Sequence, residues 1–226
     1  MVSLPLRGLS NPAGVRLAKA KSSAWPFGRC AVIVAHPDDE TLWSGGIILT
    51  HPESNWTIVT LCRKSDSDRA PKFFKALERF SAVGAMGDLD DGPEQSPLDS
   101  QEVQDTILKL LPSHTFDLII THGPMGEYTR HLRHEETGRA VLSLIEGERL
   151  FANEVWRFAY EDGGRQYLPR PAEGADLNIK LPDEIWQKKY DIITNIYGFG
   201  IDSFEAKTTP RIEAFNICKL PVFERE

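Results

Sequence analysis

The sequence has few cysteines and no long hydrophobic segment, and both features restrict the classes of protein it can belong to. Its 226 residues include only Cys30, Cys62 and Cys218, widely spaced and without a CxxC pair. Such a set argues against a disulfide framework and favours a reducing compartment, so we expect a cytoplasmic protein in which Cys30 and Cys62 are buried. No apolar run is long enough for a membrane span or a signal-peptide core.

Positive charge is also scarce. Lys and Arg total 26 against 33 Asp and Glu, which gives a net charge of −7. We therefore expect no nucleic-acid partner, because such surfaces usually need a basic face. Residues 1–37 differ, with five basic and no acidic residues. Prolines and glycines there favour an irregular arm over residues 1–29, a transit peptide being the alternative, and residues 30–226 are expected to form one catalytic domain.

Short apolar segments alternate with helical patterns along the rest of the chain. Apolar, β-branched runs predict strands at 30–35, 57–62, 116–121 and 154–160. Apolar residues at helical spacing predict helices at 39–50, 71–83, 100–111, 135–150 and 182–197. Strands that alternate with helices form a parallel sheet covered on both faces, so the predicted fold class is α/β with a mostly parallel central sheet.

Polar clusters follow two of these strands directly. The first is the segment AHPDDE at 35–40, and the second is the segment HLRH at 131–134, expected in the loop after the 116–121 strand. Ligands of such sheets bind beyond the carboxyl ends of the strands, so both clusters are candidates for one site. A chain of this length buries about 70% of its surface without a metal ion, so a metal bound there would be catalytic.

The two clusters hold the residue types of a catalytic zinc site, which uses three His or carboxylate ligands and leaves a fourth position open. His36 and Asp39 supply two ligands, and the second cluster supplies the third. Asp38 is then free to take a proton from the bound water, and His131 to stabilise the oxyanion or protonate the leaving nitrogen. Each cluster alone has a simpler explanation, an exposed histidine pair or a helix N-cap, but two clusters after buried strands make coincidence unlikely.

The motif AHPDDE after a hydrophobic strand, the Gly45-Gly46 pair and the later HxxH resemble the PIG-L/LmbE family of metal-dependent N-deacetylases over about residues 30–150. The resemblance implies a Rossmann-like three-layer sandwich with zinc bound by His36, Asp39 and His134, although Fe2+ could occupy the same ligands. It also implies that Asp38 is the general base and His131 the acid or oxyanion partner. Family substrates are mostly N-acetylglucosamine conjugates, with other N-acyl groups in some members.

Four further residues are predicted to bind substrate. Arg69 stands where the family places a substrate-binding arginine. Asp91 is expected to bond sugar hydroxyls, an ordinary turn being the alternative. Some relatives have a tyrosine two residues before the first His of the HxxH; that position is Thr129 here, and Tyr128 precedes it. His122 follows a strand directly and is expected to orient a ligand through its free nitrogen.

The sequence thus predicts a zinc-dependent hydrolase that removes an N-acetyl group from an amino-sugar conjugate. Two alternatives stay open: hydrolysis of another amide or of a phosphoester, which Arg69, Arg130 and Arg133 would favour, and a non-catalytic domain that keeps zinc for binding. A homo-oligomer is compatible with the sequence. No GxGxxG segment follows the first strand, so no nucleotide cofactor is expected.

Overall fold

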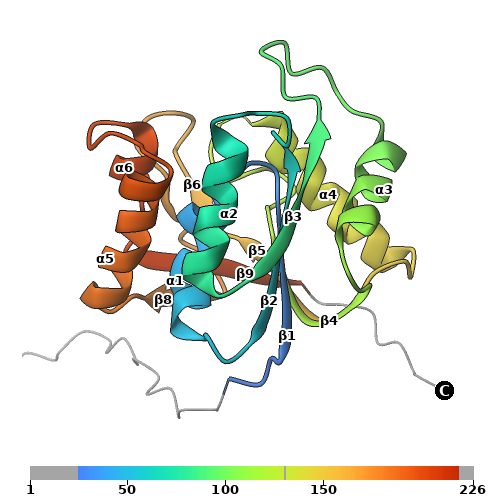
Figure 1. Ribbon diagram of the computed structural model, residues 1–226, viewed down its shortest axis with the longest axis horizontal. Helices are drawn as coiled ribbons and strands as arrows, with labels where there is room; N and C mark the ends of the chain where they lie inside the picture. Colours follow the sequence, from blue (N-terminus) through green and yellow to red (C-terminus); the bar gives the residue numbers. More distant parts are fainter. Residues whose placement is uncertain (1–24, 130, 219–226) are drawn as a thin grey trace, which may run out of the picture.

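The protein is built around a seven-stranded sheet in the order β3-β2-β1-β4-β5-β9-β8, seen edge-on in Figure 1. The computed structural model describes residues 25–129 and 131–218. The first five strands are parallel, and β9 is antiparallel to both neighbours. The strand bounds are β1 Arg29–Val34, β2 Asn55–Cys62, β3 Val83–Leu89, β4 Thr115–Thr121, β5 Phe151–Phe158, β8 Leu177–Lys180 and β9 Ile212–Cys218.

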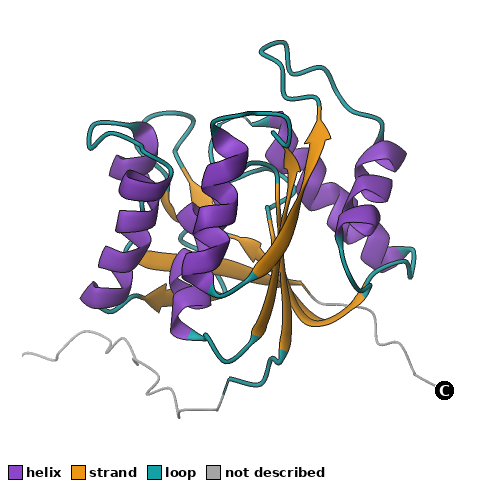
Figure 2. Cartoon of the chain, in the orientation of Figure 1, coloured by secondary structure: helices purple, strands orange, loops and turns teal. Residues whose placement is uncertain are grey.

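Helices cover both faces of this sheet, and Figure 2 shows them as separate layers. One layer contains α1, α2, α5, the π-helical turn η1 and the short α6; the other contains α3 and α4. The bounds are α1 Asp39–Thr50, α2 Arg69–Phe80, α3 Ser100–Leu110, α4 Leu132–Glu146, α5 Asp183–Asp191, η1 Ile192–Ile196 and α6 Phe204–Thr208. The predicted three-layer α/β fold with a mostly parallel sheet is confirmed.

The alternation of side chains along β1 shows why the central strands are apolar throughout. Val32 and Val34 point into the core beneath α1 and α2, while Ala31 and Ile33 point into the core beneath α3 and α4. Because helices cover both faces, the strand is hydrophobic on both sides from Cys30 to Val34, and only Arg29 at its exposed start is charged. All four residues are fully buried.

Several elements differ from the prediction. The strands β3, β8 and β9 and the helix α6 were not predicted. Helix α4 begins at Leu132 rather than Glu135, because the carbonyl of His131 already accepts a bond from the Glu135 amide. His134 therefore lies in the first turn of a helix and not in a loop. Helix α2 likewise begins at Arg69, two residues before the predicted start.

The described residues also bear on the predicted arm. Residues 1–24 lie outside the described residues, so only residues 25–29 of the predicted arm can be compared with the structure. There, Trp25 stacks on His51 with ring centroids 3.8 Å apart, and its indole N–H donates to Ser54 Oγ at 2.8 Å. Residue 25 therefore packs against the α/β domain. Within the described chain, no helix has both the length and the apolar character needed to cross a bilayer.

The strand order reverses between β1 and β4. From β1 the chain passes through α1 to β2 on one side, and from β4 it passes through α4 to β5 on the other. At such a switch point the connections diverge and leave a crevice beyond the carboxyl ends of the strands. The two polar clusters are the segments that leave β1 and β4.

Candidate active site

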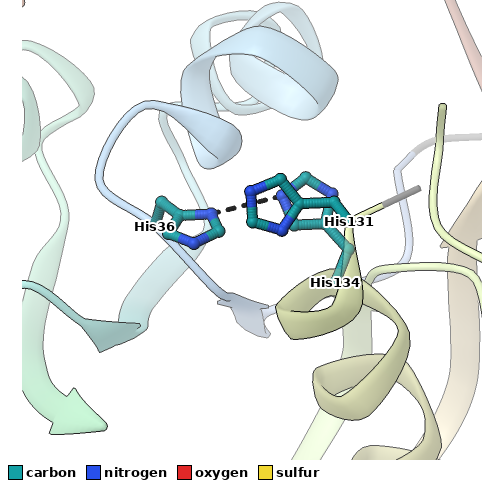
Figure 3. Close-up of side chains that lie close together, drawn as sticks. All are labelled: His36, His131 and His134. Carbon is teal, nitrogen blue, oxygen red and sulfur yellow. Dashed lines mark hydrogen bonds between the residues drawn. The ribbon is translucent and has the colours of Figure 1, made fainter. Parts of the chain in front are cut away.

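Three donor atoms from the two clusters meet in this crevice. The distance from His36 Nδ1 to Asp39 Oδ2 is 3.1 Å, and from His36 Nδ1 to His134 Nε2 it is 3.2 Å. Asp39 Oδ2 and His134 Nε2 are 3.3 Å apart. Two ligands at about 2.05 Å from a tetrahedral zinc ion stand about 3.3 Å apart, so the donor types and their spacing both fit zinc. Figure 3 shows His36 facing His134 across the crevice, with His131 beside them.

The backbone at Asp38 is in an unusual conformation. Its φ is 112° and its ψ is −30°, a region that costs a non-glycine residue about 1–3 kcal/mol and is found mainly at functional sites. Asp38 occupies the N-cap position of α1 but makes no capping hydrogen bond, so the N-cap explanation does not account for its side chain. Its Oδ2 instead accepts from Arg69 Nη1 at 2.8 Å. Burial, reinforced by the charge of Asp39, raises the pKa of Asp38 well above its usual range, and Arg69 opposes this rise.

A buried carboxylate, Glu127, stands behind His134. Its Oε2 lies 2.7 Å from His134 Nδ1 and 2.8 Å from His122 Nδ1, and its Oε1 accepts from the Gly123 amide at 3.0 Å. A carboxylate at Nδ1 keeps the proton on that nitrogen and leaves Nε2 with its lone pair toward a metal. The sequence analysis missed Glu127. An acidic residue five positions after His122, in the loop that leaves the same strand, was the available signal.

His122 lies beneath the site. It is fully buried and does not line the cavity described below. Its Nε2 accepts from the Ala35 amide at 3.0 Å, which assigns the proton to Nδ1, where it is donated to Glu127. The geometry therefore fits a residue that fixes Glu127 and the backbone at Ala35, next to His36, rather than one that touches substrate.

Asp91 orients His36 in a similar way. Its Oδ1 lies 3.2 Å from His36 Nε2 and accepts from Gln95 Nε2 at 2.8 Å, and its Oδ2 accepts from Arg63 Nε at 2.7 Å. Both oxygens are engaged within the protein. Asp91 also borders the cavity, so its predicted contact with a sugar hydroxyl stays a prediction.

A cavity of about 260 Å³ opens beside His36 and Asp39, whereas His134 is fully buried and does not line it. Besides the first polar cluster it is lined by Leu42, Arg63, Arg69, Asp91, Tyr128, His131, Phe204 and Glu205. Of the four predicted substrate-binding residues, Arg69, Asp91 and Tyr128 therefore face it and His122 does not. Phe204 and Glu205 belong to α6, and no local sequence signal could have connected them with the site.

Tyr128 and His131 stand on the α4 side of this cavity. The Tyr128 hydroxyl has no hydrogen-bond partner among the described residues, and burial raises its pKa, so the phenol stays protonated. The His131 ring stacks on His134 with centroids 4.4 Å apart. Burial, with the nearby His134 and His36, lowers the pKa of His131 to about 3, so this ring is neutral.

The predicted arginine cluster for a phosphoester is not assembled in the described residues. Arg133 is buried and donates to the Asp90 carbonyl and to the Ser96 carbonyl, both away from the cavity. Arg69 is paired with Asp38. Arg130 lies outside the described residues. Of the two described arginines, Arg69 therefore lines the cavity and is paired with Asp38, whereas Arg133 does not line it.

Comparisons with solved structures show where this fold occurs. The N,N'-diacetylchitobiose deacetylase from Pyrococcus horikoshii matches with a TM-score of 0.64 and 14% identity, over 85% of this chain and 84% of that one. The 4-carboxy-2-hydroxymuconate hydratase GalB from Pseudomonas putida KT2440 matches with a TM-score of 0.57 and 17% identity, over 88% and 99%. At these identities the likeness shows a common fold.

Sequence comparisons identify the family as well as the fold. The 1D-myo-inositol 2-acetamido-2-deoxy-alpha-D-glucopyranoside deacetylase of Actinosynnema mirum is 28% identical over 196 residues, covering 69% of this chain and 68% of that protein. The family model described as "PIG-L: GlcNAc-PI de-N-acetylase" matches residues 31–145. That match spans more than half of the chain and includes all three donor residues, Asp38 and His131. The chain therefore belongs to the PIG-L family.

Proposed function

We propose that this protein is a zinc-dependent N-deacetylase that removes the acetyl group from an N-acetylglucosamine-type conjugate. The observation that carries the proposal is the triangle of donor atoms from His36, Asp39 and His134, with edges of 3.1–3.3 Å. It lies beside a cavity that Asp38 also lines. The family and the named activities of the deacetylases from Actinosynnema mirum and Pyrococcus horikoshii support an amino-sugar substrate.

His36, Asp39 and His134 would hold the zinc ion, and Fe2+ would fit the same donors. A zinc ion with three protein ligands lowers the pKa of water to about 7 and polarises a carbonyl oxygen, which is the chemistry that amide hydrolysis needs. Glu127 and Asp91 hold the two imidazoles with the correct nitrogen forward.

Asp38 is the general base in this proposal. Its carboxylate takes a proton from the attacking water and passes it to the nitrogen of the breaking C–N bond, so that the products are acetate and a free amine. The raised pKa of Asp38 suits a group that must both accept and return a proton. Arg69 holds the carboxylate in one orientation through its 2.8 Å contact.

Tyr128 and His131 complete the site. The protonated Tyr128 phenol is placed to donate to the oxygen of the acyl carbonyl, where negative charge develops. His131, as a neutral ring, is better suited to donate an N–H to that oxygen than to act as the acid for the amine.

The test uses the full chain, stripped of metal by a chelator and reloaded with zinc or Fe2+. Release of free amine from N-acetylglucosamine conjugates is compared with hydrolysis of a chromogenic phosphoester. We expect amine release that depends on metal, and an Asp38→Asn variant that binds zinc normally but is at least about 100-fold slower. Asp183→Asn, whose side chain is 97% exposed, is the matched control.

Two results would contradict the proposal. A zinc-loaded protein that releases no amine from any N-acetylated amino sugar would remove the proposed activity. An Asp38→Asn variant with an unchanged rate would remove the base from the mechanism but leave the activity in place.

A further inference from the structure

The position of Tyr128 depends on a segment that lies outside the family match. Its ring lies 5.4 Å from that of His134 and 5.9 Å from that of His131, nearly perpendicular to both. Tyr128 also lines a second, more open cavity of about 590 Å³, so its side chain is part of the wall between that cavity and the catalytic one. A small shift of this loop would move the phenol out of the catalytic cavity.

The next residue, Thr129, is held by Asp162 from the connection between β6 (Tyr160–Glu161) and β7 (Arg170–Pro171). The Thr129 amide donates to Asp162 Oδ2 at 2.8 Å, and the Thr129 hydroxyl donates to Asp162 Oδ1 at 2.8 Å. Arg165 Nε donates to the Thr129 carbonyl at 2.6 Å. All three polar groups of Thr129 are therefore bonded to one short segment of a distant part of the chain.

Asp162 is itself fixed in place. It is only 6% exposed, its Oδ1 also accepts from the Gly164 amide at 3.0 Å, and its carbonyl accepts from the Gln166 amide at 2.9 Å. A carboxylate with charge-assisted bonds to a backbone N–H and to a hydroxyl gives a stronger attachment than neutral partners would. The β6–β7 connection is thus a fixed support and not a loose strap.

Tyr128 is enclosed between two attached neighbours. On its other side, Glu127 is bonded to His134, His122 and the Gly123 amide. Because residues 127 and 129 are both held, the backbone of Tyr128 between them is restrained. Glu127 ties the loop to the metal ligands, while Asp162 ties it to the β6–β7 connection.

We propose that Asp162 is a positioning residue that, by holding Thr129, keeps the Tyr128 hydroxyl in the catalytic cavity. This inference rests on the proposed deacetylase function, in which Tyr128 donates to the acyl carbonyl. It assigns a role in catalysis to a residue beyond the 31–145 segment matched by the family model. Asp162 touches neither the donor atoms nor the catalytic cavity, so it acts only through the loop.

The kinetic test is a double-mutant cycle on the zinc-loaded full chain with an N-acetylglucosamine conjugate. We expect Asp162→Ala to lower kcat about tenfold, with little change in zinc affinity, and to have less than a twofold effect in a Tyr128→Phe background, because the group it positions is then absent. Glu161→Gln, on the same connection but bonded to Tyr167, is the matched control and should retain the wild-type rate. Equal losses in both backgrounds would overturn the proposal.

Asp162→Asn is a more conservative variant, included in case Asp162→Ala does not fold. It keeps the acceptor for the Thr129 hydroxyl and for Gly164 but sets an amide group against the Thr129 N–H, so only one bond is lost. We expect an effect on kcat in the same direction as Asp162→Ala and smaller. An Asn variant that is folded and fully active, together with an inactive Ala variant, would show that Asp162 supports the fold alone and would overturn the proposal.

Hydrogen exchange separates this inference from the proposed function, because it needs no turnover. The peptide that contains Thr129 should exchange faster in Asp162→Ala than in wild type, while the peptide that contains His36 is unchanged. If the protein hydrolyses no N-acetylated sugar, the proposed function fails, yet the exchange of Thr129 still decides whether Asp162 holds the loop. Unchanged exchange at Thr129 would overturn the positioning role.

Discussion

Replacing Glu127 by glutamine tests the electrostatic design of the site most directly. The carboxylate is fully buried and accepts three hydrogen bonds, at 2.7 Å and 2.8 Å on Oε2 and at 3.0 Å on Oε1. A glutamine can place its single oxygen where Oε2 serves both imidazoles, but its amide group then faces the Gly123 N–H. Turned the other way, the amide group faces the two histidines, which lose their acceptor. Either orientation leaves at least one donor opposed by another donor.

The expected loss of zinc affinity follows from this geometry. Loss of an orienting partner behind a ligating histidine costs about 10–100-fold in metal affinity, or about 1.4–2.7 kcal/mol. Glu127→Gln keeps one acceptor and the side-chain volume, so we expect about a tenfold loss. Glu127→Ala keeps neither and also leaves buried donors unpaired, so we expect a loss nearer 100-fold. That Glu127→Ala loses more zinc affinity than Glu127→Gln is as informative as the size of either loss.

The assay is zinc competition against a chromophoric chelator at pH 7.5, with circular dichroism to establish that each variant is folded. Glu146→Gln, at the exposed last residue of helix α4, is the matched control and should bind zinc as the wild type does. If folded Glu127→Gln binds zinc with wild-type affinity, Glu127 does not set the tautomer of His134. If neither Glu127 variant changes the affinity, the metal is bound by other residues.

Two further predictions concern packing and thiol chemistry. Gly138→Ala should lower the stability by about 1–3 kcal/mol in denaturant unfolding, because the new Cβ would stand 2.5 Å from the carbonyl oxygen of His122; a variant as stable as wild type would contradict this close approach. Burial raises the pKa of Cys30 to about 12 and also raises that of Cys62, so both thiols stay protonated at pH 8. Because the thiolate is the reactive form, neither should react with a disulfide reagent until the protein unfolds. Rapid reaction of all three thiols in the native protein would refute it.

The parts of the fold that were predicted from sequence are those with strong local signals. Helix α1 has the predicted bounds, because the stiff turn at Pro37 and the acidic pair mark its start. Strand β3 was missed because Gly84 and Gly87 resemble turn residues. Both glycines are needed for another reason, since a Cβ at either position would collide with a backbone carbonyl of β2. Local composition cannot distinguish a turn glycine from one required by a close approach.

Strand β9 shows a second kind of failure. Its Glu213 is fully buried, which no strand pattern would suggest. The carboxylate accepts from the Gly46 and Ile47 amides inside α1 at 2.7 Å and 2.8 Å and from Lys189 Nζ at 2.7 Å. Gly46 allows this approach, because a Cβ there would stand 2.9 Å from Glu213 Oε1. Partners separated by more than 160 residues carry no signal that either segment reveals alone.

The same limit applied to the candidate site, where the sequence indicated the three donor residues but neither Glu127 nor the contact of Asp91 with His36. The sequence predicted that His36, Asp39 and His134 lie close together, because two polar clusters follow two strands of one parallel sheet. The roles of Glu127 and Asp91 depend on which nitrogen of each imidazole faces inward, and that is decided by the tertiary structure. His122 was expected to support a ligand, and its contacts with Ala35 and Glu127 show how it does so.

In the proposed function, the reacting groups and part of the cavity wall lie in different parts of the chain. The donor atoms, Asp38 and His131 all lie within residues 31–145, which match the family model, whereas Phe204 and Glu205 in the cavity wall and Asp162 behind Tyr128 lie beyond them. The fold itself does not select a reaction, since a hydratase shares it. The substrate must therefore satisfy two independent conditions: an acyl group that reaches the donor triangle, and a remainder that fits against α6. Conjugates that vary only in that remainder should change KM far more than kcat, and equal changes in both would show that α6 takes part in positioning the acyl group.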